Sequence, residues 1–243
     1  MKELTRAKKG ADPLLMGINY DPENIELKKM LQLVNISNKK ILEIGCGIGR
    51  VTTQIAKITK EVYAIDVDEE VLKVAKRKSL KLKLKNIKFD KVSADKIKYP
   101  DKFFDVVLCP WSIHHISKKD KTFRQIKRVL KRNGYLVIIE ASSKNDYTEL
   151  SNLIKTKEKR RIENRASFIF RLAKKHFQLI KKIHFVSYYL ISSKKKTLDL
   201  LDVYKVPIER IDAKYLNKFL EKRMVGNNYK ISESGYIATF RCS

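Results

Sequence analysis

Short apolar runs alternate with helically spaced segments through the middle of this chain. The apolar runs occupy residues 39–45, 61–66, 103–110 and 135–142, and residues 87–92 alternate weakly between apolar and polar. Helical spacing of apolar residues fills the gaps between them, most clearly at 49–57, 68–79 and 121–134. Strands that are apolar almost throughout are buried on both faces, which requires helices on both sides of a parallel sheet. The alternation therefore predicts a doubly wound α/β fold.

The two ends of the chain extend this pattern. Residues 24–35 have helical spacing, and the helix over 121–134 ends in Asn133-Gly134, a pair typical of a left-handed helix end. The pattern after residue 142 predicts a long or broken helix over 148–180, a strand over 181–192, two short helices and no strong strand over 194–232, and a last strand over 235–241. No stretch rich in Gly, Pro or Ser marks a linker. Residues 1–243 are therefore expected to form a single domain.

A glycine-rich turn follows the first predicted strand. The sequence Glu43-Ile44-Gly45-Cys46-Gly47-Ile48-Gly49 leads directly into a helix. Glycine lets the backbone turn tightly and approach a ligand, and a helix start offers unpaired N–H groups. The spacing is G-x-G-x-G, which differs from the dinucleotide-binding G-x-G-x-x-G. Asp66 ends the second strand, where a carboxylate can accept both hydroxyls of a ribose. The alternatives are a purely structural turn and, for Asp66, an N-cap of the helix that begins near Asp68.

These residues resemble the class I S-adenosylmethionine-dependent methyltransferases. The similar segments are residues 41–50, 62–72, 92–105, 108–116 and 126–141. They lie within residues 20–142 and are most similar to the branch that contains the ubiquinone/menaquinone-type C-methyltransferases. The resemblance implies a Rossmann-like sheet of seven strands, mostly parallel with an antiparallel last strand. It places the cofactor-binding core at 20–142, and helical substrate-side elements at the N-terminal end and at 143–180 and 192–234.

The resemblance also implies a cofactor, S-adenosyl-L-methionine, with S-adenosyl-L-homocysteine as its product. The implied cofactor-binding residues lie at successive strand ends: Glu43, Gly45, Cys46, Gly47, Gly49, Asp66, Val67, Ala94, Asp95 and Pro110. In this assignment the three glycines wrap the methionine part, Glu43 organises the glycine turn or orients the cofactor amine, and Asp66 binds the ribose. Ala94 and Asp95 meet the adenine edge, while Val67 and Ile97 pack on its faces. Asp95 is alternatively an ordinary loop acid, because Ser93 occupies the usual position of the first acid in this loop.

The segment after the fourth strand is the candidate catalytic region. His114 and His115 would lie beside the transferred methyl group, and either is a candidate general base because histidine titrates near neutral pH. A hydrogen bond within the fold is the alternative for both. Trp111 is a candidate to shape the substrate pocket or to contact the sulfonium, and alternatively fills space. Cys109-Pro110-Trp111-Ser112 differs from the Asn/Asp-Pro-Pro-Tyr/Phe signature of amino-methylating nucleic-acid enzymes, which argues against base N-methylation by that mechanism.

The chain is strongly basic. Lys and Arg number 54 against 27 Asp and Glu, giving a net charge of +27, which indicates a polyanionic partner unless it reflects a lysine-rich genome composition. Residues 155–182 combine Lys and Arg with Phe168, Phe170, His176 and Phe177, a pattern suited to phosphate contact with base stacking. The alternative is a solvated helix face whose aromatic side chains are buried. The substrate-side candidates are Tyr20, Trp111, Lys159, Arg160 and Arg161.

Three functions remain open at this point. We expect a methyltransferase that acts on a small molecule. An RNA methyltransferase of tRNA or rRNA that uses the basic 155–182 segment is the alternative, and a non-catalytic cofactor-binding partner module is the third. Methyl transfer is a displacement dominated by positioning, so it does not always need a base.

The cysteine and hydropathy patterns narrow the class of protein. Cys46, Cys109 and Cys242 form no CxxC pair, so neither a disulfide framework nor a metal site is expected. No apolar stretch reaches membrane-spanning length, and the first residues lack the apolar core of a secretory signal. The chain is therefore expected to be cytoplasmic and without membrane partners, and its oligomeric state stays open.

Overall fold

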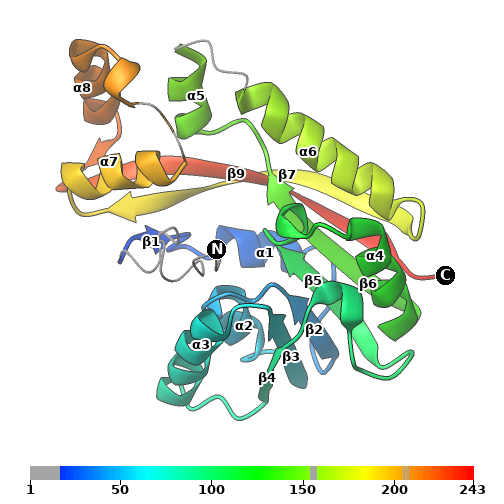
Figure 1. Ribbon diagram of the computed structural model, residues 1–243. Coiled ribbons are helices and arrows are strands. Elements are labelled where there is room, and N and C mark those ends of the chain that lie inside the picture. Colours follow the sequence, from blue (N-terminus) through cyan, green and yellow to red (C-terminus); the bar gives the residue numbers. More distant parts are fainter. Residues whose placement is uncertain (1–16, 154–157, 205, 207) are drawn as a thin grey trace, which may run out of the picture. The chain divides into compact units, whose positions relative to one another are not determined.

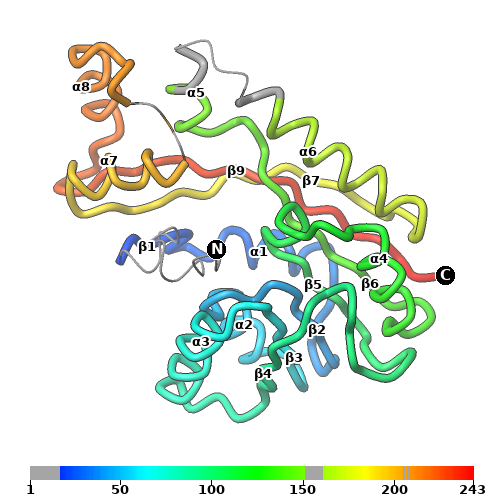
Figure 2. The backbone as a smooth tube through the Cα atoms, viewed as in Figure 1, coloured from blue at the N-terminus to red at the C-terminus, as the bar shows by residue number. Residues whose placement is uncertain are grey.

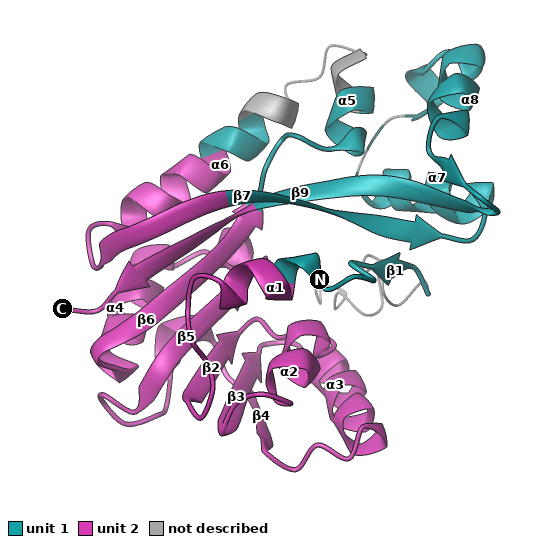
Figure 3. Cartoon of the chain, turned by 180° about the vertical axis from the view of Figure 1, so that it is seen from behind, with its two compact units in different colours: residues 1–26, 141–164, 184–235 teal, residues 27–140, 165–183, 236–243 magenta. Residues whose placement is uncertain are grey.

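The chain forms two compact units, which Figure 3 colours separately. The computed structural model describes the backbone of residues 17–153, 158–204, 206 and 208–243. Within these residues, unit 1 consists of the segment up to residue 26 together with 141–164 and 184–235, and unit 2 consists of 27–140, 165–183 and 236–243. The strands β7 (Gln178–Ile191) and β9 (Asn228–Arg241) contribute residues to both units. The expectation of a single domain stays a prediction.

Unit 2 is built on a mostly parallel sheet (Figure 1). Its strands are β2 (Lys40–Ile44), β3 (Glu61–Asp66), β4 (Ile87–Lys91), β5 (Phe104–Pro110), β6 (Leu130–Ala141) and parts of β7 and β9, in the order β7-β9-β6-β5-β2-β3-β4. The pairs β2–β3, β2–β5, β3–β4 and β5–β6 are parallel. The N–H of Asn133 and the C=O of Gly134, near the start of β6, bond to Cys242, which directly follows β9, so these strands run in opposite directions. The predicted doubly wound sheet with an antiparallel last strand is confirmed.

Helices cover both faces of this sheet because alternate strand residues point to opposite sides. They are α1 (Ile25–Leu31), α2 (Arg50–Ile55), α3 (Glu69–Lys81), α4 (Lys119–Val129) and α6 (Glu158–Ala173). Leu42, Ile44 and Ile65 share one buried cluster with Phe123 of α4 and Ile169 of α6. Helices α2 and α3 contact β3, and α3 also contacts β4. Figure 2 follows this β–α alternation along the chain.

The helix predicted over 121–134 is wrong at its C-terminal end. Helix α4 ends at Val129, and β6 begins at Leu130. Asn133 has the left-handed φ of 63° that its pairing with Gly134 suggested, but it lies inside the strand. The pairing of β5 with β6 jumps from Phe104–Leu130 to Val106–Tyr135, so residues 131–134 bulge from the ladder. The Asn133-Gly134 pair therefore serves a bulge in the sheet and does not end a helix.

Unit 1 contains the elements β1 (Asn19–Tyr20), α5 (Asp146–Leu153), α7 (Lys194–Val203), α8 (Ala213–Glu221), β8 (Met224–Val225) and parts of β7 and β9. Strand β1 pairs antiparallel with β7, with Tyr20 opposite Tyr189. Strands β8 and β9 form a hairpin around Gly226, whose φ is 59°. Two predictions are therefore wrong in part. The segment 194–232, expected to lack a strong strand, contains the start of β9 at Asn228, so the element over 192–234 is not helical throughout. The element over 143–180, expected to be helical, contains the start of β7 at Gln178. The Gly226-Asn227 pair is a hairpin signal that could have revealed this turn.

Candidate active site

The glycine loop, residues 45–49, follows β2 and is anchored on β3. The N–H groups of Gly45 and Cys46 both donate to the carbonyl of Ile65, at 2.8 and 3.1 Å. Gly45 has a φ of 71°, and a Cβ at this position would lie 2.5 Å from Cβ of Ser112. Gly47 has a φ of 53°, and a Cβ there would meet no described atom within 4 Å. The loop therefore needs glycine at Gly45 for close packing, and at Gly47 it leaves open space beside a bare backbone.

Asp66 is tied to this loop by its carboxylate. Its Oδ2 accepts from the N–H of Gly47 at 2.9 Å, and its Oδ1 accepts from the N–H of Asp68 at 3.0 Å. The N-cap of α3 is Asp68, whose side chain accepts from the N–H of Glu70 at 2.9 Å. Asp66 is therefore not the helix cap that the alternative interpretation assumed. Each carboxylate oxygen has a second lone pair, so Asp66 can also accept hydroxyl groups of a ribose.

Glu43 lies buried at the end of β2 and supports the loop from behind. The hydroxyl of Thr52 on α2 donates to its Oε2 at 2.6 Å, which ties the helix to the strand. Cys46 is also buried, and its burial raises the pKa of the thiol, with the carboxylates of Glu43 and Asp66 adding to the effect. A neutral thiol is a weak nucleophile. The bond from Thr52 agrees with the first of the two roles expected of Glu43, organising the glycine turn, and a cofactor contact by Glu43 or Cys46 stays a prediction.

The predicted adenine side lies after β3 and β4. Val67 is 63% exposed, an unusual position for a valine, and offers an apolar face beside Asp66. Ala94 and Asp95 are buried in the short 3-10 helix Ala94–Lys96. The hydroxyl of Ser93 and the ammonium groups of Lys121 and Lys118 lower the pKa of the Asp95 carboxyl. Asp95 is therefore an ionised acceptor at this position, as an amino group would require. Ile97, in contrast, is buried in the core cluster rather than exposed beside Val67.

The two candidate catalytic histidines differ in their surroundings. The side chain of His114 is 12% exposed, and its Nδ1 lies 2.7 Å from Oε2 of Glu140, whose side chain is 0% exposed. The backbone N–H of His114 donates to the other oxygen of Glu140 at 3.1 Å. Glu140 therefore contacts both the backbone and Nδ1 of His114, which leaves Nε2 as the ring nitrogen outside this pair. His115 is exposed, with its ring 4.0 Å from that of His114. This geometry favours His114 as the base.

Glu140 was missed by the sequence analysis. It lies near the C-terminal end of β6, and β6 pairs with β5, the strand that leads to His114. Its sequence signal is one acid that ends the apolar run Leu136–Ile139. A fully buried carboxylate needs partners, but the sequence does not show which distant group provides them.

Pro110 and Trp111 connect β5 to the histidines. Pro110 is the last residue of β5 and is buried. Trp111 is half-buried, has a φ of 55°, and donates its N–H to the carbonyl of Ile139 at 2.9 Å. A positive φ is costly for a bulky residue and occurs most often where a site requires it. Trp111 therefore marks a forced turn between the sheet and the candidate catalytic segment.

Tyr20, a predicted substrate-side residue, belongs to a buried network in unit 1. We call this network the tyrosine–glutamate cluster; it consists of Tyr20, Glu26, Tyr147, Tyr189, Tyr204 and Glu233. The hydroxyls of Tyr147 and Tyr204 donate to the two oxygens of Glu233 at 3.0 and 2.7 Å. The rings of Tyr147 and Tyr204 stack with centroids 4.1 Å apart. Burial raises the pKa of Glu233 to about 7.

The same cluster reaches the N-terminal segment. The hydroxyl of Tyr20 donates to Glu26 at 3.2 Å, and its ring lies 4.8 Å from that of Tyr189. The hydroxyls of Tyr189 and Tyr204 are 2.5 Å apart. These contacts occupy Tyr20 within unit 1. They connect residues spread over more than 200 positions, which explains why sequence reasoning did not find them.

The aromatic side chains of residues 155–182 do not form a stacking surface. Phe170 and Phe177 are buried in the core of unit 2, and His176 lies 2.8 Å from the Asp120 carboxylate. Only Phe168 among these four is exposed. Arg161 is exposed, while the side chains of Lys159 and Arg160 lie outside the described residues. The alternative interpretation, buried aromatics on a solvated helix, describes this segment better.

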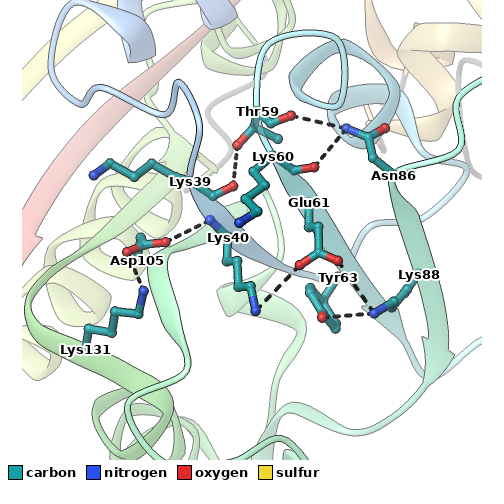
Figure 4. Close-up of polar contacts among 10 residues, drawn as sticks. All are labelled: Lys39, Lys40, Thr59, Lys60, Glu61, Tyr63, Asn86, Lys88, Asp105 and Lys131. Carbon is teal, nitrogen blue, oxygen red and sulfur yellow. Dashed lines mark hydrogen bonds and ion pairs between the residues drawn. The ribbon is translucent and has the colours of Figure 1, made fainter.

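Several lysines form ion pairs with acids near the starts of the strands, at the end of the sheet opposite the glycine loop (Figure 4). Glu61 lies 3.7 Å from both Lys40 and Lys88, and Asp105 lies 2.8 Å from Lys131. A cavity of about 370 Å³ at this end is lined by Asp105, Lys131 and neighbouring residues. Part of the excess of lysine therefore stabilises the starts of strands. This cavity lies at the strand starts, away from the glycine loop.

The His, Cys, Asp and Glu side chains of the described residues form no group of three that could hold a metal ion. None of the helices in this part of the chain is both long enough and apolar enough to cross a bilayer.

Comparison with known proteins places this geometry in a family. A family model described as methyltransferase domain matches residues 35–199. The ubiquinone/menaquinone biosynthesis C-methyltransferase UbiE of Pseudomonas aeruginosa (strain LESB58) is 33% identical over 110 residues, which is 44% of this chain and 43% of that protein. The chain therefore spans less than half the length of this curated relative.

Solved structures share the fold. A SAM-dependent methyltransferase from Aquifex aeolicus has a TM-score of 0.56 at 21% identity and covers 96% of both chains. The N-methyltransferase NodS from Bradyrhizobium japonicum WM9, solved with S-adenosyl-L-homocysteine, has a TM-score of 0.56 at 12% identity and covers 91% of this chain and 89% of NodS. Because the matched family model spans more than half of its residues, the chain belongs to the S-adenosylmethionine-dependent methyltransferases.

Proposed function

We propose that this protein transfers a methyl group from S-adenosylmethionine to a small-molecule acceptor. The observation that carries the proposal is the open space at Gly47, directly beside the carboxylate of Asp66. A bare backbone and a hydroxyl acceptor at adjacent strand ends are the features that a nucleoside-containing cofactor needs. The relative UbiE, named for ubiquinone/menaquinone biosynthesis, supports a small-molecule acceptor.

The residues present fit this cofactor. Asp66 would accept the ribose hydroxyls, exposed Val67 would pack against the adenine ring, and Asp95 would accept from its amino group. Bound there, S-adenosylmethionine would supply an electrophilic methyl group attached to its sulfonium sulfur. After transfer of the methyl group, the rest of the cofactor would be a neutral thioether, S-adenosylhomocysteine. The glycine loop would hold the methionine end without steric conflict at Gly47.

His114 is proposed as the general base. Its Nε2 would accept the proton that the acceptor atom loses as that atom forms its bond to the methyl carbon. Glu140 would hold the ring and keep the proton on Nδ1, since it bonds both Nδ1 and the backbone N–H of His114. Glu140 would thus act through His114 as a positioning residue. General bases of this kind contribute about 10²–10⁴-fold to rate.

The proposal is tested by transfer of labelled methyl from S-adenosylmethionine to a fractionated cell extract. The expected result is label in the small-molecule fraction with wild-type protein and much less label with Asp66→Ala at the same cofactor concentration. Label released by ribonuclease would instead assign RNA, and label in protein would assign a protein acceptor. Binding of S-adenosylhomocysteine without transfer to any fraction would favour a non-catalytic partner module.

An RNA acceptor is the second candidate, and the net charge of +27 favours it. Arg171, Lys174 and Lys175 are exposed at the end of α6. If they contact phosphates of single-stranded RNA, replacing all three with Ala should flatten the salt dependence of binding by about two units, at roughly 0.7 per phosphate. Methyl transfer to RNA should fall in the same variant while cofactor affinity holds. Normal transfer by the variant would leave these residues as a solvated face.

A further inference from the structure

Ser112 carries a buried hydroxyl with no partner. The residue is 6% exposed, and its Oγ has no hydrogen-bond partner among the described residues. A buried hydroxyl normally finds a partner, because leaving one unpaired costs free energy. Few side chains in the described part of the chain share this condition, and Ser112 is the one that touches the glycine loop. The position therefore calls for an explanation.

The hydroxyl lies beside the first glycine of the loop. A Cβ added to Gly45 would lie 2.5 Å from the Ser112 Cβ and 3.3 Å from its Oγ. The preceding residue, Trp111, has the positive φ of 55° that sets the direction of this turn. The close approach of Ser112 to the loop therefore depends on two features, the positive φ of Trp111 and the absence of a side chain at Gly45.

The loop itself has few N–H groups to offer. Gly45 and Cys46 donate to Ile65, Gly47 donates to Asp66, and Gly49 donates to the carbonyl of Cys46. The sequence analysis expected unpaired N–H groups here, but these four are engaged within the protein. Because these four N–H groups are already used, a donor from another segment would add to the binding of an anionic group at the loop.

The order of the strands indicates which part of a ligand meets Ser112. Strand β2, which leads into the loop, lies between β3 and β5. Asp66 ends β3 and Val67 follows it on one side, and Ser112 follows β5 on the other. If Asp66 holds the ribose and Val67 the adenine, the amino-acid end of the cofactor extends across the loop toward β5.

We propose that the Ser112 hydroxyl donates a hydrogen bond to the carboxylate at the methionine end of the bound cofactor. This inference rests on the proposed function. The hydroxyl is left unpaired in the free protein and gains its partner when the ligand binds. Ser112 is therefore a binding residue for one end of the cofactor, and it makes no contribution to recognition of the adenosine end.

Two ligands separate the ends of the cofactor. S-adenosylhomocysteine has the amino-acid end, whereas 5′-methylthioadenosine has the same nucleoside and thioether without it. Calorimetry should show that Ser112→Ala weakens S-adenosylhomocysteine about 10-fold or more, as expected for a hydrogen bond to a charged group. Its affinity for 5′-methylthioadenosine should stay within about twofold of wild type.

A stability measurement and a control variant complete the test. Ligand-free Ser112→Ala should melt at the same temperature as wild type or higher, because it loses an unpaired buried hydroxyl. Thr122 on α4 has a hydroxyl that is buried and unpaired in the same way, so Thr122→Val should leave both affinities unchanged.

The outcomes distinguish the inference from the function on which it rests. Equal losses for both ligands in Ser112→Ala, or no loss for S-adenosylhomocysteine, would overturn the assignment of Ser112 while leaving the cofactor in place. An equal loss in Thr122→Val would also overturn it, since the effect would then follow from any buried hydroxyl. Wild-type protein that binds neither ligand would overturn the proposed function and the inference together.

Discussion

The glycine loop of unit 2 and the tyrosine–glutamate cluster of unit 1 both place a carboxylate in a strand, but they use it in opposite ways. Asp66 is held by two backbone N–H groups and stays partly exposed beside open space at Gly47. Glu233 is buried, and tyrosine hydroxyls bond both of its oxygens. The first arrangement leaves acceptor capacity for a ligand, whereas the second uses it inside the fold.

The comparison shows that the partners of an acid decide its role. Backbone donors at a strand end fix Asp66 without enclosing it. Side-chain donors enclose Glu233, and burial raises its pKa to about 7. Glu140 resembles Glu233 in burial, but its partner is His114, a histidine whose other ring nitrogen, Nε2, is available for proton transfer. We expect the following changes to separate these roles.

The largest effect is expected for Gly47→Val. A β-branched side chain would occupy the open space beside Asp66 and oppose the φ of 53°. Calorimetry should detect no binding of S-adenosylhomocysteine. Gly226 has a similar φ of 59° and similarly open surroundings in the β8–β9 turn, so Gly226→Val is a control with comparable strain. Retained binding in folded Gly47→Val would show that the loop is only a turn.

The next largest effect is expected for the histidine pair. His114→Gln should lower kcat by about 10²–10⁴-fold, and Glu140→Gln should lower it through loss of the Nδ1 proton position and change the pH profile of kcat. Affinity for S-adenosylhomocysteine should hold in both variants. His115→Gln, at the exposed neighbour, is the matched control and should retain most activity. Equal kcat values for the two histidine variants would contradict the assignment.

A smaller effect is expected for Asp66→Ala. Losing the acceptor of the ribose hydroxyls should weaken cofactor binding by ~2–4 kcal/mol. Asp68→Ala removes the N-cap of α3 and should instead lower the free energy of unfolding by about 1 kcal/mol with little change in affinity. Calorimetry and chemical unfolding of the two variants measure both quantities. Unchanged affinity in folded Asp66→Ala would place the ribose elsewhere.

The smallest effect concerns Glu233 and pH. Its folded pKa of about 7 exceeds the ordinary value of 4.5, so the native state binds more protons than the unfolded state between these values. The contribution of Glu233 to the free energy of unfolding should therefore be largest below about pH 4.5 and be lost as the pH rises through 7, by up to about 3 kcal/mol. Glu233→Gln should remove this fall.

Urea unfolding at pH 5 and pH 8 measures that difference. Glu221 is exposed on α8, so Glu221→Gln should keep the wild-type pH dependence. A Glu233→Gln protein with the same pH dependence as wild type would show that Glu233 titrates normally and that the cluster does not differ from the loop in this respect.

The two regions also differed in how far the sequence predicted them. The glycine loop and Asp66 lie at the ends of adjacent strands, and their hydrogen bond joins elements that the β–α alternation had already placed side by side. Glu140 and His114 are 26 positions apart and meet through the pairing of β5 and β6. The Glu233 contacts join segments still further apart, and the strand over 228–234 was not predicted at all. Prediction weakened as the sequence separation of the partners grew.

By itself the sequence determined the features that depend on neighbouring residues. Apolar periodicity identified the strands and helices, because burial on a strand or helix follows a fixed repeat. The spacing of the glycines identified a loop whose backbone turns tightly and carries no side chain at the glycine positions. Tertiary structure alone decided that Asn133-Gly134 forms a bulge, that Glu140 orients His114, and that Ser112 is left unpaired beside Gly45. A buried polar group depends on which distant donor or acceptor the fold brings within about 3 Å, and no local pattern contains that information.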